Sequence, residues 1–558
     1  MNKDLNFFTK AIIIAILLFV LVAQDLLAQK KLDTLEIDVS KLYIPTISDA
    51  VKISENPTVN DSTPKIPVLT YPIVSTKINT GFDLDPIKPA KMEGEPLTKL
   101  YHALVKAGFG NYTTPYGEFF FNSLRSKDYD FAAHVKHLSS SPVLSNNEFL
   151  GYSDNEASIS GKRFFNKETL LGNIDYSRNV VHYTDYANEN VILQPQIKQR
   201  FTLIESQAEL VSYFTDSSKI NHDVKLKYYN LGDINHASEN NVNVDGVFKG
   251  YYNKELISLD AAVDYYNNKS KDTTNNTILK LNPSITSSTD KMKASVGLNA
   301  FADIHSDKSF YFYPKIDFNY NVIDYILVPY AGVTGGLDKN SYLSLSKENP
   351  FVVSNVSLQN SNTKYEVYGG INGTLASFAS YNIRVSQKKI NNLPLFVGDY
   401  SNSTLSTYQR AYNYLVIYDD AKVFNLHGEL GYQESEKFKL TAKADYNQYT
   451  MTNEMKAWHK PAFDMVLSGN YNLRDKIILK ADVFFFGKQY AKTYDSAMNV
   501  VAKELKGIAD INLGVEYRYT KLMSAFINFN NIGAFNYYIW NNYPSQRFNL
   551  MAGVSLAF

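Results

Sequence analysis

The sequence predicts an all-β protein, a single large transmembrane antiparallel β-barrel of about 22 strands with short periplasmic turns and longer extracellular loops. Three observations predict this fold. From residue 100 onward, apolar and polar residues alternate with period two, in runs of about 9–12 residues that suit a tilted membrane strand. The polar positions carry acidic and basic side chains in run after run. After residue 28, no apolar run approaches the roughly 18 residues of a membrane helix.

The composition narrows the classes of function. The 558 residues include 56 basic and 56 acidic side chains, so the chain offers no basic surface for nucleic acid. There is no cysteine, which excludes disulfide frameworks, thiolate zinc sites, cysteine nucleophiles and a lipid-modified N-terminal cysteine. The 42 tyrosines suit a surface that is half apolar and half wet, such as a membrane interface.

Residues 1–28 are predicted to be a secretory signal peptide. Lys3 and Lys10 precede an apolar run over residues 11–23, and Ala28 supplies the small residue before the cut. This run is too short for a stable membrane span, although an N-terminal anchor helix is the alternative. We therefore expect an exported protein that begins at Gln29 and is located in the cell outer membrane.

Residues 29–99 form a separate zone, which contains eight of the 18 prolines. Proline at this density prevents long helices and central strands. We expect an extended periplasmic or lumenal segment, and the simplest reading is a flexible tether.

Residues 100–558 form the predicted barrel, and the last strand shows the alternation most clearly. One of its faces carries Phe548, Leu550, Ala552, Val554, Leu556 and Phe558. Residues 509–519 and 477–485 repeat the pattern. A soluble sandwich would need several pairs of sheets over some 450 residues to bury these apolar faces, whereas one barrel explains them all.

Strand number follows from the connections. Ten short turns alternate with eleven longer loops, which gives 21 connections and 22 strands, with both chain ends on the short-turn side. Bacterial barrels have this parity. The count requires Ala411–Tyr432 to be one strand despite Asp419 and Asp420, and it places a loop at Asn391–Arg410.

Two stretches resemble a known family. Residues 509–519 and 543–558 look like the end of a TonB-dependent receptor barrel, and residues 87–96 and 106–115 resemble the start of plugless receptor-like barrels of the Bacteroidota. An aromatic residue that ends an alternating strand resembles the signal read by the outer-membrane barrel assembly machinery. The residues of that signal are Phe548, Leu550, Val554, Leu556 and Phe558.

The resemblance implies partners: the lipid bilayer, the barrel assembly machinery, and TonB or another envelope protein. The run Asp33, Thr34, Leu35, Glu36 and Ile37 resembles a short TonB-binding box. The chain departs from the family because only 71 residues (29–99) precede the barrel, where a receptor has a globular plug. Barrels of 22 strands normally have a filled lumen, so another element is expected to fill this one.

No catalytic constellation is apparent. The sequence has no GxSxG, P-loop or HExxH motif, so neither an enzyme nor a metal or other cofactor is predicted. The strand register predicts charged and polar residues that line the lumen with a near-neutral sum, which argues against strong ion selectivity. These are Lys315, Asp317, His427, Glu429, Lys443, Asp445, Asp510, Glu516 and Arg518.

Specificity is expected in the outer loops, where aromatic residues gather. The candidates for contact with a ligand or partner are Trp458, Tyr537, Tyr538, Trp540 and Tyr543. Alternatively, these side chains anchor the barrel at the outer interface or fold over the lumen.

Two functions of different class follow from these observations. The first is a solute channel or TonB-receptor-like transport protein without a full plug, gated by the N-terminal segment or by loops. The second is a non-transporting accessory or structural subunit of an outer-membrane complex.

Overall fold

The computed structural model describes residues 100–142, 150–183, 198–270, 273–305, 308–376, 378–400, 413–495, 497 and 499–558. The described residues belong to one compact unit, Glu95–Phe558. The predicted signal peptide, the proline-rich segment and the TonB-box-like run lie outside the described residues, so these predictions stay predictions.

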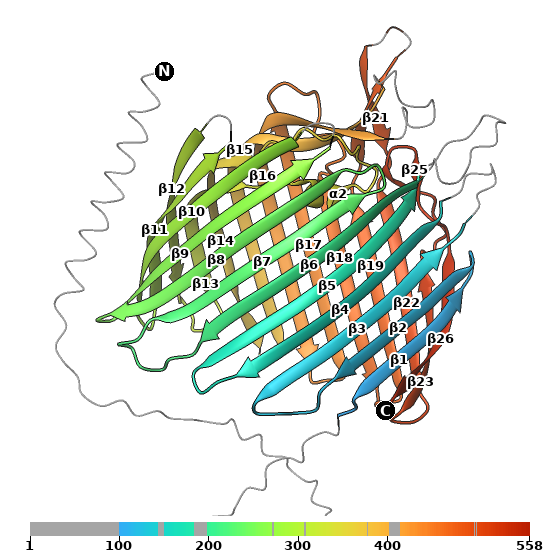
Figure 1. Cartoon of the computed structure of the whole chain (residues 1–558), viewed down its shortest axis with the longest axis horizontal. Helices are drawn as coiled ribbons and strands as arrows, with labels where there is room; N and C mark the ends of the chain where they lie inside the picture. The colour runs from blue at the N-terminus through green and yellow to red at the C-terminus, as the bar shows by residue number, and fades with distance from the viewer. Residues whose placement is uncertain are drawn as a thin grey trace, which may run out of the picture. The chain divides into compact units, whose positions relative to one another are not determined.

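The described chain forms a closed antiparallel barrel of 22 strands in sequence order (Figure 1). Its strands are β1 Ala103–Gly110, β2 Thr114–Asn122, β3 Tyr129–Ser140, β4 Tyr152–Phe164, β5 Glu168–His182, β6 Lys198–Ser212, β7 Asn221–Asp233, β8 Ser238–Tyr252, β9 Glu255–Lys269, β10 Thr273–Ser288, β11 Met292–Ile304, β12 Lys308–Tyr320, β13 Val328–Asp338, β14 Ser361–Ala376, β15 Ala379–Gly398, β16 Tyr414–Glu434, β17 Phe438–Met451, β18 Phe463–Leu473, β19 Ile477–Phe486, β22 Ile508–Arg518, β23 Met523–Asn530 and β26 Asn549–Ala557.

The predicted fold class and strand number are confirmed. The long strand predicted across Asp419 and Asp420 is also confirmed, because β16 runs without a break through both residues. β15 extends further than predicted: a loop was expected from Asn391, but pairing with β16 resumes at Leu393 after a register shift and continues to Gly398. A β-bulge absorbs the shift, so the polar pair Asn391 and Asn392 does not end the strand.

The strands carry apolar side chains outward and polar side chains inward, as β12 shows. Phe310 and Phe312 are each 67% exposed on the outer face, whereas Tyr313 between β11 and β13 is buried on the inner face. An exposed band of aromatic side chains of this kind is stable in contact with lipid, as in outer-membrane barrels.

The barrel closes where β1 pairs with β26, with Leu104 opposite Ala557 and Gly110 opposite Met551. Gly553 faces inward at this seam, and a Cβ there would lie 2.4 Å from both the Ala107 carbonyl and the Phe526 ring. A larger residue would clash with both groups, so this position at the seam requires glycine.

Several small elements gather at the end of the barrel with the long loops (Figure 1). They are helix α2 Tyr342–Glu348, the hairpin of β20 Gln489–Tyr494 with β21 Val500–Leu505, and the hairpin of β24 Tyr538–Trp540 with β25 Tyr543–Pro544. In the described part of the chain, no helix has the length and apolarity of a membrane span.

Candidate functional site

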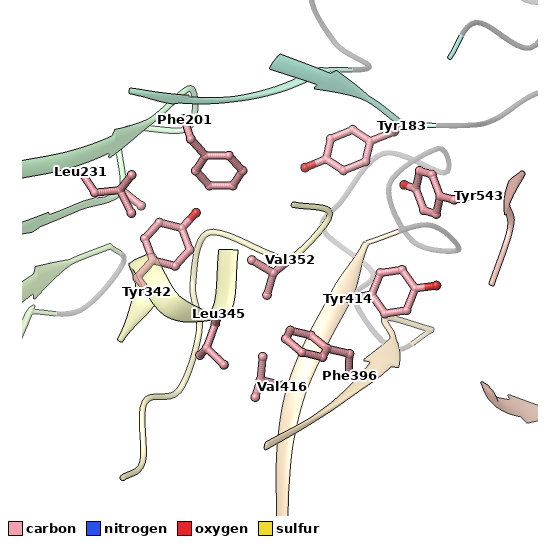
Figure 2. Close-up of a cluster of buried hydrophobic side chains, with 11 residues drawn as sticks. Tyr183, Phe201, Leu231, Tyr342, Leu345, Val352, Phe396, Tyr414, Val416 and Tyr543 are labelled. Atoms are coloured by element: carbon pink, nitrogen blue, oxygen red, sulfur yellow. The ribbon is translucent and has the colours of Figure 1, made fainter. Parts of the chain in front are cut away.

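A hydrophobic core crosses the barrel at its loop end. Figure 2 shows Tyr342 and Leu345 of α2 between Phe201 and Leu231 on one side and Phe396 on the other. Phe201 and Leu231 belong to β6 and β7, and Phe396 belongs to β15. Twenty-two strands spaced about 4.8 Å apart and tilted by about 40° enclose a barrel roughly 40 Å across. Since β6 and β15 are nearly opposite in the strand order, this core bridges the lumen.

The connection from β13 to β14 supplies the centre of the bridge, and buried carboxylates hold it. Glu239 of β8 is fully buried and accepts hydrogen bonds from the backbone N–H groups of Tyr342 (2.7 Å) and Leu343 (3.2 Å). Tyr229 donates to the same carboxylate at 2.8 Å. A carboxylate at the first turn of a helix satisfies N–H groups that the helix itself cannot.

A second carboxylate, Asp233 at the end of β7, ties the same connection to the wall. The Tyr342 hydroxyl donates to it at 2.8 Å, and the Ser354 hydroxyl also donates to it. Burial and the nearby Asp233 raise the pKa of Tyr342 well above its usual range, so this phenol stays a donor. The bridge is thus bonded to the wall at the first turn of α2 and again at Ser354, beyond the end of the helix.

The outer part of the β15–β16 hairpin forms the roof of this core, since Pro394–Val397 are buried in succession. Phe396 faces the first core, whereas Leu395 and Val397 pack against Trp458 in a second one. Trp458 is fully buried and its Nε1 donates to Glu454 at 2.7 Å. This part of β15 is therefore buried on both faces: one face packs against the first core and the other against the second core. Three layers of structure meet here.

His459 joins three of these connections. Its Nδ1 lies 3.0 Å from the Phe396 carbonyl, and its Nε2 accepts the backbone N–H of Asn541 at 3.4 Å. This pairing needs a neutral ring with the proton on Nδ1. Burial lowers the pKa of His459 from 6.5 to about 4, which keeps the ring neutral.

Ion pairs and ring stacking complete the assembly. Lys460 binds Glu348 at the end of α2 at 2.6 Å, and Lys492 of β20 binds Glu454 at 2.9 Å. The Phe351 and Tyr543 rings stack with centroids 3.5 Å apart. We call this assembly the cap; it comprises residues 339–360, 393–400, 452–462, 489–494 and 537–545.

The predicted lumen-lining residues face inward by the parity of their strands. Within the described residues many inward charges are paired with a neighbouring strand. His427 lies 2.9 Å from Asp445 on the neighbouring strand, whereas Glu516 lies 3.4 Å from Arg518 on its own strand, β22. Asp317 accepts the Tyr368 hydroxyl. Other pairs around the wall are Lys106–Glu118, Lys227–Glu205, Lys280–Asp260 and Arg384–Glu366.

The remaining predicted lumen-lining residues are placed as follows. Glu429 lies 3.8 Å from His427. Lys443 on β17 is the register partner of Glu429. Lys315 sits opposite Gly297 on β11. Asp510 accepts the Tyr537 hydroxyl at 2.5 Å, so this wall residue is bonded to the cap.

The predicted aromatic loop residues divide into two groups. Trp458 and Tyr543 are buried in the cap, and Trp540 packs edge-on against Phe396 with centroids 5.2 Å apart. Tyr538 is 38% exposed. Contact of these residues with a ligand or partner stays a prediction, and in this closed arrangement Trp458 is inaccessible to one.

The residues of the predicted assembly signal lie on the outer wall of the barrel. Leu550, Val554 and Leu556 are exposed along one face of β26, Phe548 directly precedes the strand, and the exposed Phe558 directly follows it. Their recognition by the assembly machinery remains a prediction.

The sequence did not indicate α2 or the buried carboxylates. α2 has only seven residues, too few for a helical period, although Ser341 and Ser344 form a reciprocal capping box that a search for caps would find. Glu239 and Asp233 have the same parity as other inward acidic residues, and only their depth under α2 distinguishes them.

No family model and no curated protein matches the sequence. Several solved structures match in fold. The ferripyoverdine receptor of the outer membrane of Pseudomonas aeruginosa has 12% identity and a TM-score of 0.62, over 83% of this chain and 72% of that one. The FrpB iron transporter from Neisseria meningitidis has 9% identity and a TM-score of 0.63, over 83% and 82%.

The ferric enterobactin receptor PfeA from Pseudomonas aeruginosa is a third, with 12% identity and a TM-score of 0.59, over 82% of this chain and 80% of that one. At these identities the likeness establishes the fold alone. The barrel is of the kind found in outer-membrane receptors and an iron transporter. Within the described residues, no three His, Asp or Glu side chains gather as a metal site.

Proposed function

We propose that the protein is an outer-membrane transport barrel without a full plug, and that the cap is its outer gate. One observation carries this proposal: a hydrophobic core made of the chain's own loops bridges the lumen between nearly opposite walls. A barrel that only needed to be stable would gain little from closing a mouth on the aqueous side. The fold shared with the ferripyoverdine receptor and the FrpB transporter supports a transport role.

The polar lumen below the cap supports the same reading. Its charged side chains pair across strands, and Lys280 lies 2.7 Å from Asp260 and 3.9 Å from Asp245. Paired charges on a wide wall tolerate water without imposing strong ion selection. A passage of this kind would suit a solute larger than an ion.

The proposal includes the segments outside the described residues. Residues 1–28 would be removed on export, and residues 29–99 would lie on the periplasmic side or in the lumen and bind TonB through Asp33–Ile37. The resemblance to plugless barrels of the Bacteroidota fits the short length of this segment.

Single-channel recording in planar bilayers tests the proposal. The mature chain should be nearly silent, and a variant with residues 341–358 replaced by a short glycine–serine linker should show a steady large conductance. A variant lacking residues 29–99 separates the two candidate gates. If the linker variant folds, as shown by heat-modifiable gel mobility, and stays silent, the cap is not the gate.

A second candidate function is an accessory subunit that docks partners. The exposed hairpin of β20 and β21 favours it, because Val500 and Val501 are 38% and 43% exposed beyond the barrel wall. A silent linker variant that co-purifies with other envelope proteins, and loses them when this hairpin is removed, would favour the accessory role.

A further inference from the structure

A cavity of about 510 Å³ opens beside the cap, between its trailing segment and the ends of β9 to β12. This volume is within the roughly 300–1,000 Å³ of small-molecule sites. Residues 355–360 form one wall, and Tyr266, Asn276, Asp303 and Tyr311 line the other.

The wall formed by residues 355–360 is fixed in place. The Tyr418 hydroxyl donates to the Ser357 carbonyl at 3.0 Å and accepts the Gln359 N–H at 3.1 Å. Asn360 donates to Asp303 across the cavity edge at 2.8 Å. Leu358 packs against the small core of Tyr266, Ile278 and Leu337. The cavity is therefore built, and its side chains are pre-positioned.

The lining is dominated by amides. It includes Asn268, Asn275, Asn276, Asn355, Gln359, Asn360 and Asn392. Asn276 is 5% exposed and Asn360 is 9% exposed, and the Oδ1 atom of each has no hydrogen-bond partner among the described residues. Asp303 Oδ1 is in the same state. A buried acceptor without a donor is unfavourable, so these three atoms favour a ligand that brings O–H or N–H groups.

The charge of the lining selects among such ligands. The lining contains neither Lys nor Arg, and its one carboxylate, Asp303, already accepts a bond from Asn360. By contrast, the cavity at the β22–β23 turn contains Lys106, Lys480, Arg518 and Lys521. His305 is in the lining, but its Nδ1 lies 2.9 Å from the Asn275 carbonyl. Without Lys or Arg, the lining offers an anionic ligand no permanent counter-charge near Asp303, so a neutral ligand fits better.

One tyrosine can supply an apolar face. Tyr311 is half-buried and stacks with Tyr313 at a centroid distance of 6.3 Å and an interplanar angle of 7°. Tyr266 is buried behind the lining and is held by Asn276 at 3.2 Å. Amides that exchange hydrogen bonds with hydroxyls, next to an aromatic ring that can cover a C–H face, suit a sugar ring.

We propose that this cavity binds a neutral saccharide. Hydroxyl groups of the sugar donate to Asn276, Asn360 and Asp303, and Asn355 and Gln359 contact it from the cap. This site lies at the loop end of the inner wall, under the trailing segment of the cap, and binding there is measured without a current.

The test uses the full mature chain in detergent. It is applied to a glycan array that includes neutral and acidic oligosaccharides, and the strongest neutral glycan is then measured by calorimetry. The Asn355→Ala/Gln359→Ala double variant changes two exposed side chains that the cap core does not use. Asn470→Ala, an exposed amide on β18, is the matched control. Heat-modifiable gel mobility verifies that the wild type, the double variant and Asn470→Ala are folded.

We expect saturable binding of a neutral glycan, weakened about tenfold or more by the double variant and unchanged by Asn470→Ala. The Tyr311→Ala variant should also bind the same glycan more weakly than the wild type does. The proposal is wrong if no neutral glycan is retained, if only acidic glycans or a ferric chelate bind, or if the double variant binds as well as the wild type. Since none of these readouts is a current, their failure is distinct from failure of the gate.

Discussion

The carboxylate of Glu239 accepts the backbone N–H of Tyr342 at 2.7 Å, although 103 residues separate them in the chain. Glu239 is fully buried at the start of β8, and Tyr342 begins α2. One side chain of the barrel wall thus fixes the end of the helix that bridges the mouth. This contact makes the closed state depend on the wall.

Replacing Glu239 with alanine should loosen the cap and leave the barrel intact. Two helical N–H groups and the Tyr229 hydroxyl lose their acceptor, which costs roughly 1–3 kcal/mol for an unsatisfied buried donor. We expect open-channel events in planar bilayers to rise by about tenfold or more. Glu156→Ala is the control, since this lumen glutamate is 41% exposed and its ion pair among the described residues is with Lys136. Equal currents in both variants would contradict the role of Glu239.

Acid should open the cap through His459. Its pKa is lowered to about 4 in the folded protein, below the ordinary 6.5, so the unfolded or open state binds the proton more tightly. The stability that the neutral ring supplies is present above pH 6.5 and is lost as the pH falls toward 4. The difference of 2.5 units amounts to about 3 kcal/mol. Channel opening in the wild type should rise across this window.

The His459→Gln variant isolates this effect from other acidic groups, because glutamine cannot titrate. Its opening should depend less steeply on pH between 6.5 and 4 than that of the wild type. An identical pH profile in the two proteins would show that other groups cause the response.

Truncation of Trp458 should release the second core. The side chain is fully buried among Leu395, Val397 and Ala457, and removing a buried tryptophan costs about 3–5 kcal/mol. We expect rapid hydrogen exchange across residues 452–462 with unchanged exchange in β17 and β18. Tyr538→Ala, at a side chain 38% exposed, should leave exchange as in the wild type. Slow exchange in the Trp458→Ala variant would show that the hairpin roof does not need it.

A methyl group at Gly553 should hinder barrel closure. The added Cβ would lie 2.4 Å from the Ala107 carbonyl, which belongs to the backbone of β1 and cannot move aside. Less of the Gly553→Ala protein should reach the compact, heat-modifiable form in outer membranes. Gly117→Ala on the neighbouring β2 meets no atom within 4 Å and should assemble normally. Normal assembly of both variants would argue against tight packing at the seam.

Period-two alternation was enough to predict the barrel, because one residue in two must face lipid along every strand. The strand number of 22 came from counting the turns and loops between the alternating runs. The continuous β16 could be predicted for a different reason. Splitting it at Asp419 would have placed the two chain ends on opposite sides. Parity thus carried information that the local sequence, with two adjacent acidic residues, did not.

The cap could not be predicted, because its residues come from connections without a period. The sequence predicts a loop for Leu393, Leu395 and Phe396. In the structure they form a strand because Trp458 packs against one of its faces and the core around α2 packs against the other. The conformation of these segments depends on tertiary packing and not on a local sequence pattern. Trp458 and Tyr543 were singled out as aromatic residues, but the sequence does not reveal whether such a side chain faces outward or into a core.

The first hydrophobic core unites Tyr183, just after β5, with Tyr543 of β25, in the connection that leads to the last strand. A core with members from early and late in the chain cannot be complete until β25 is in place. The β1–β26 seam needs the last strand as well, so the wall and the mouth both depend on the end of the chain. A leaky protein would therefore report on unfinished folding as well as on an open gate.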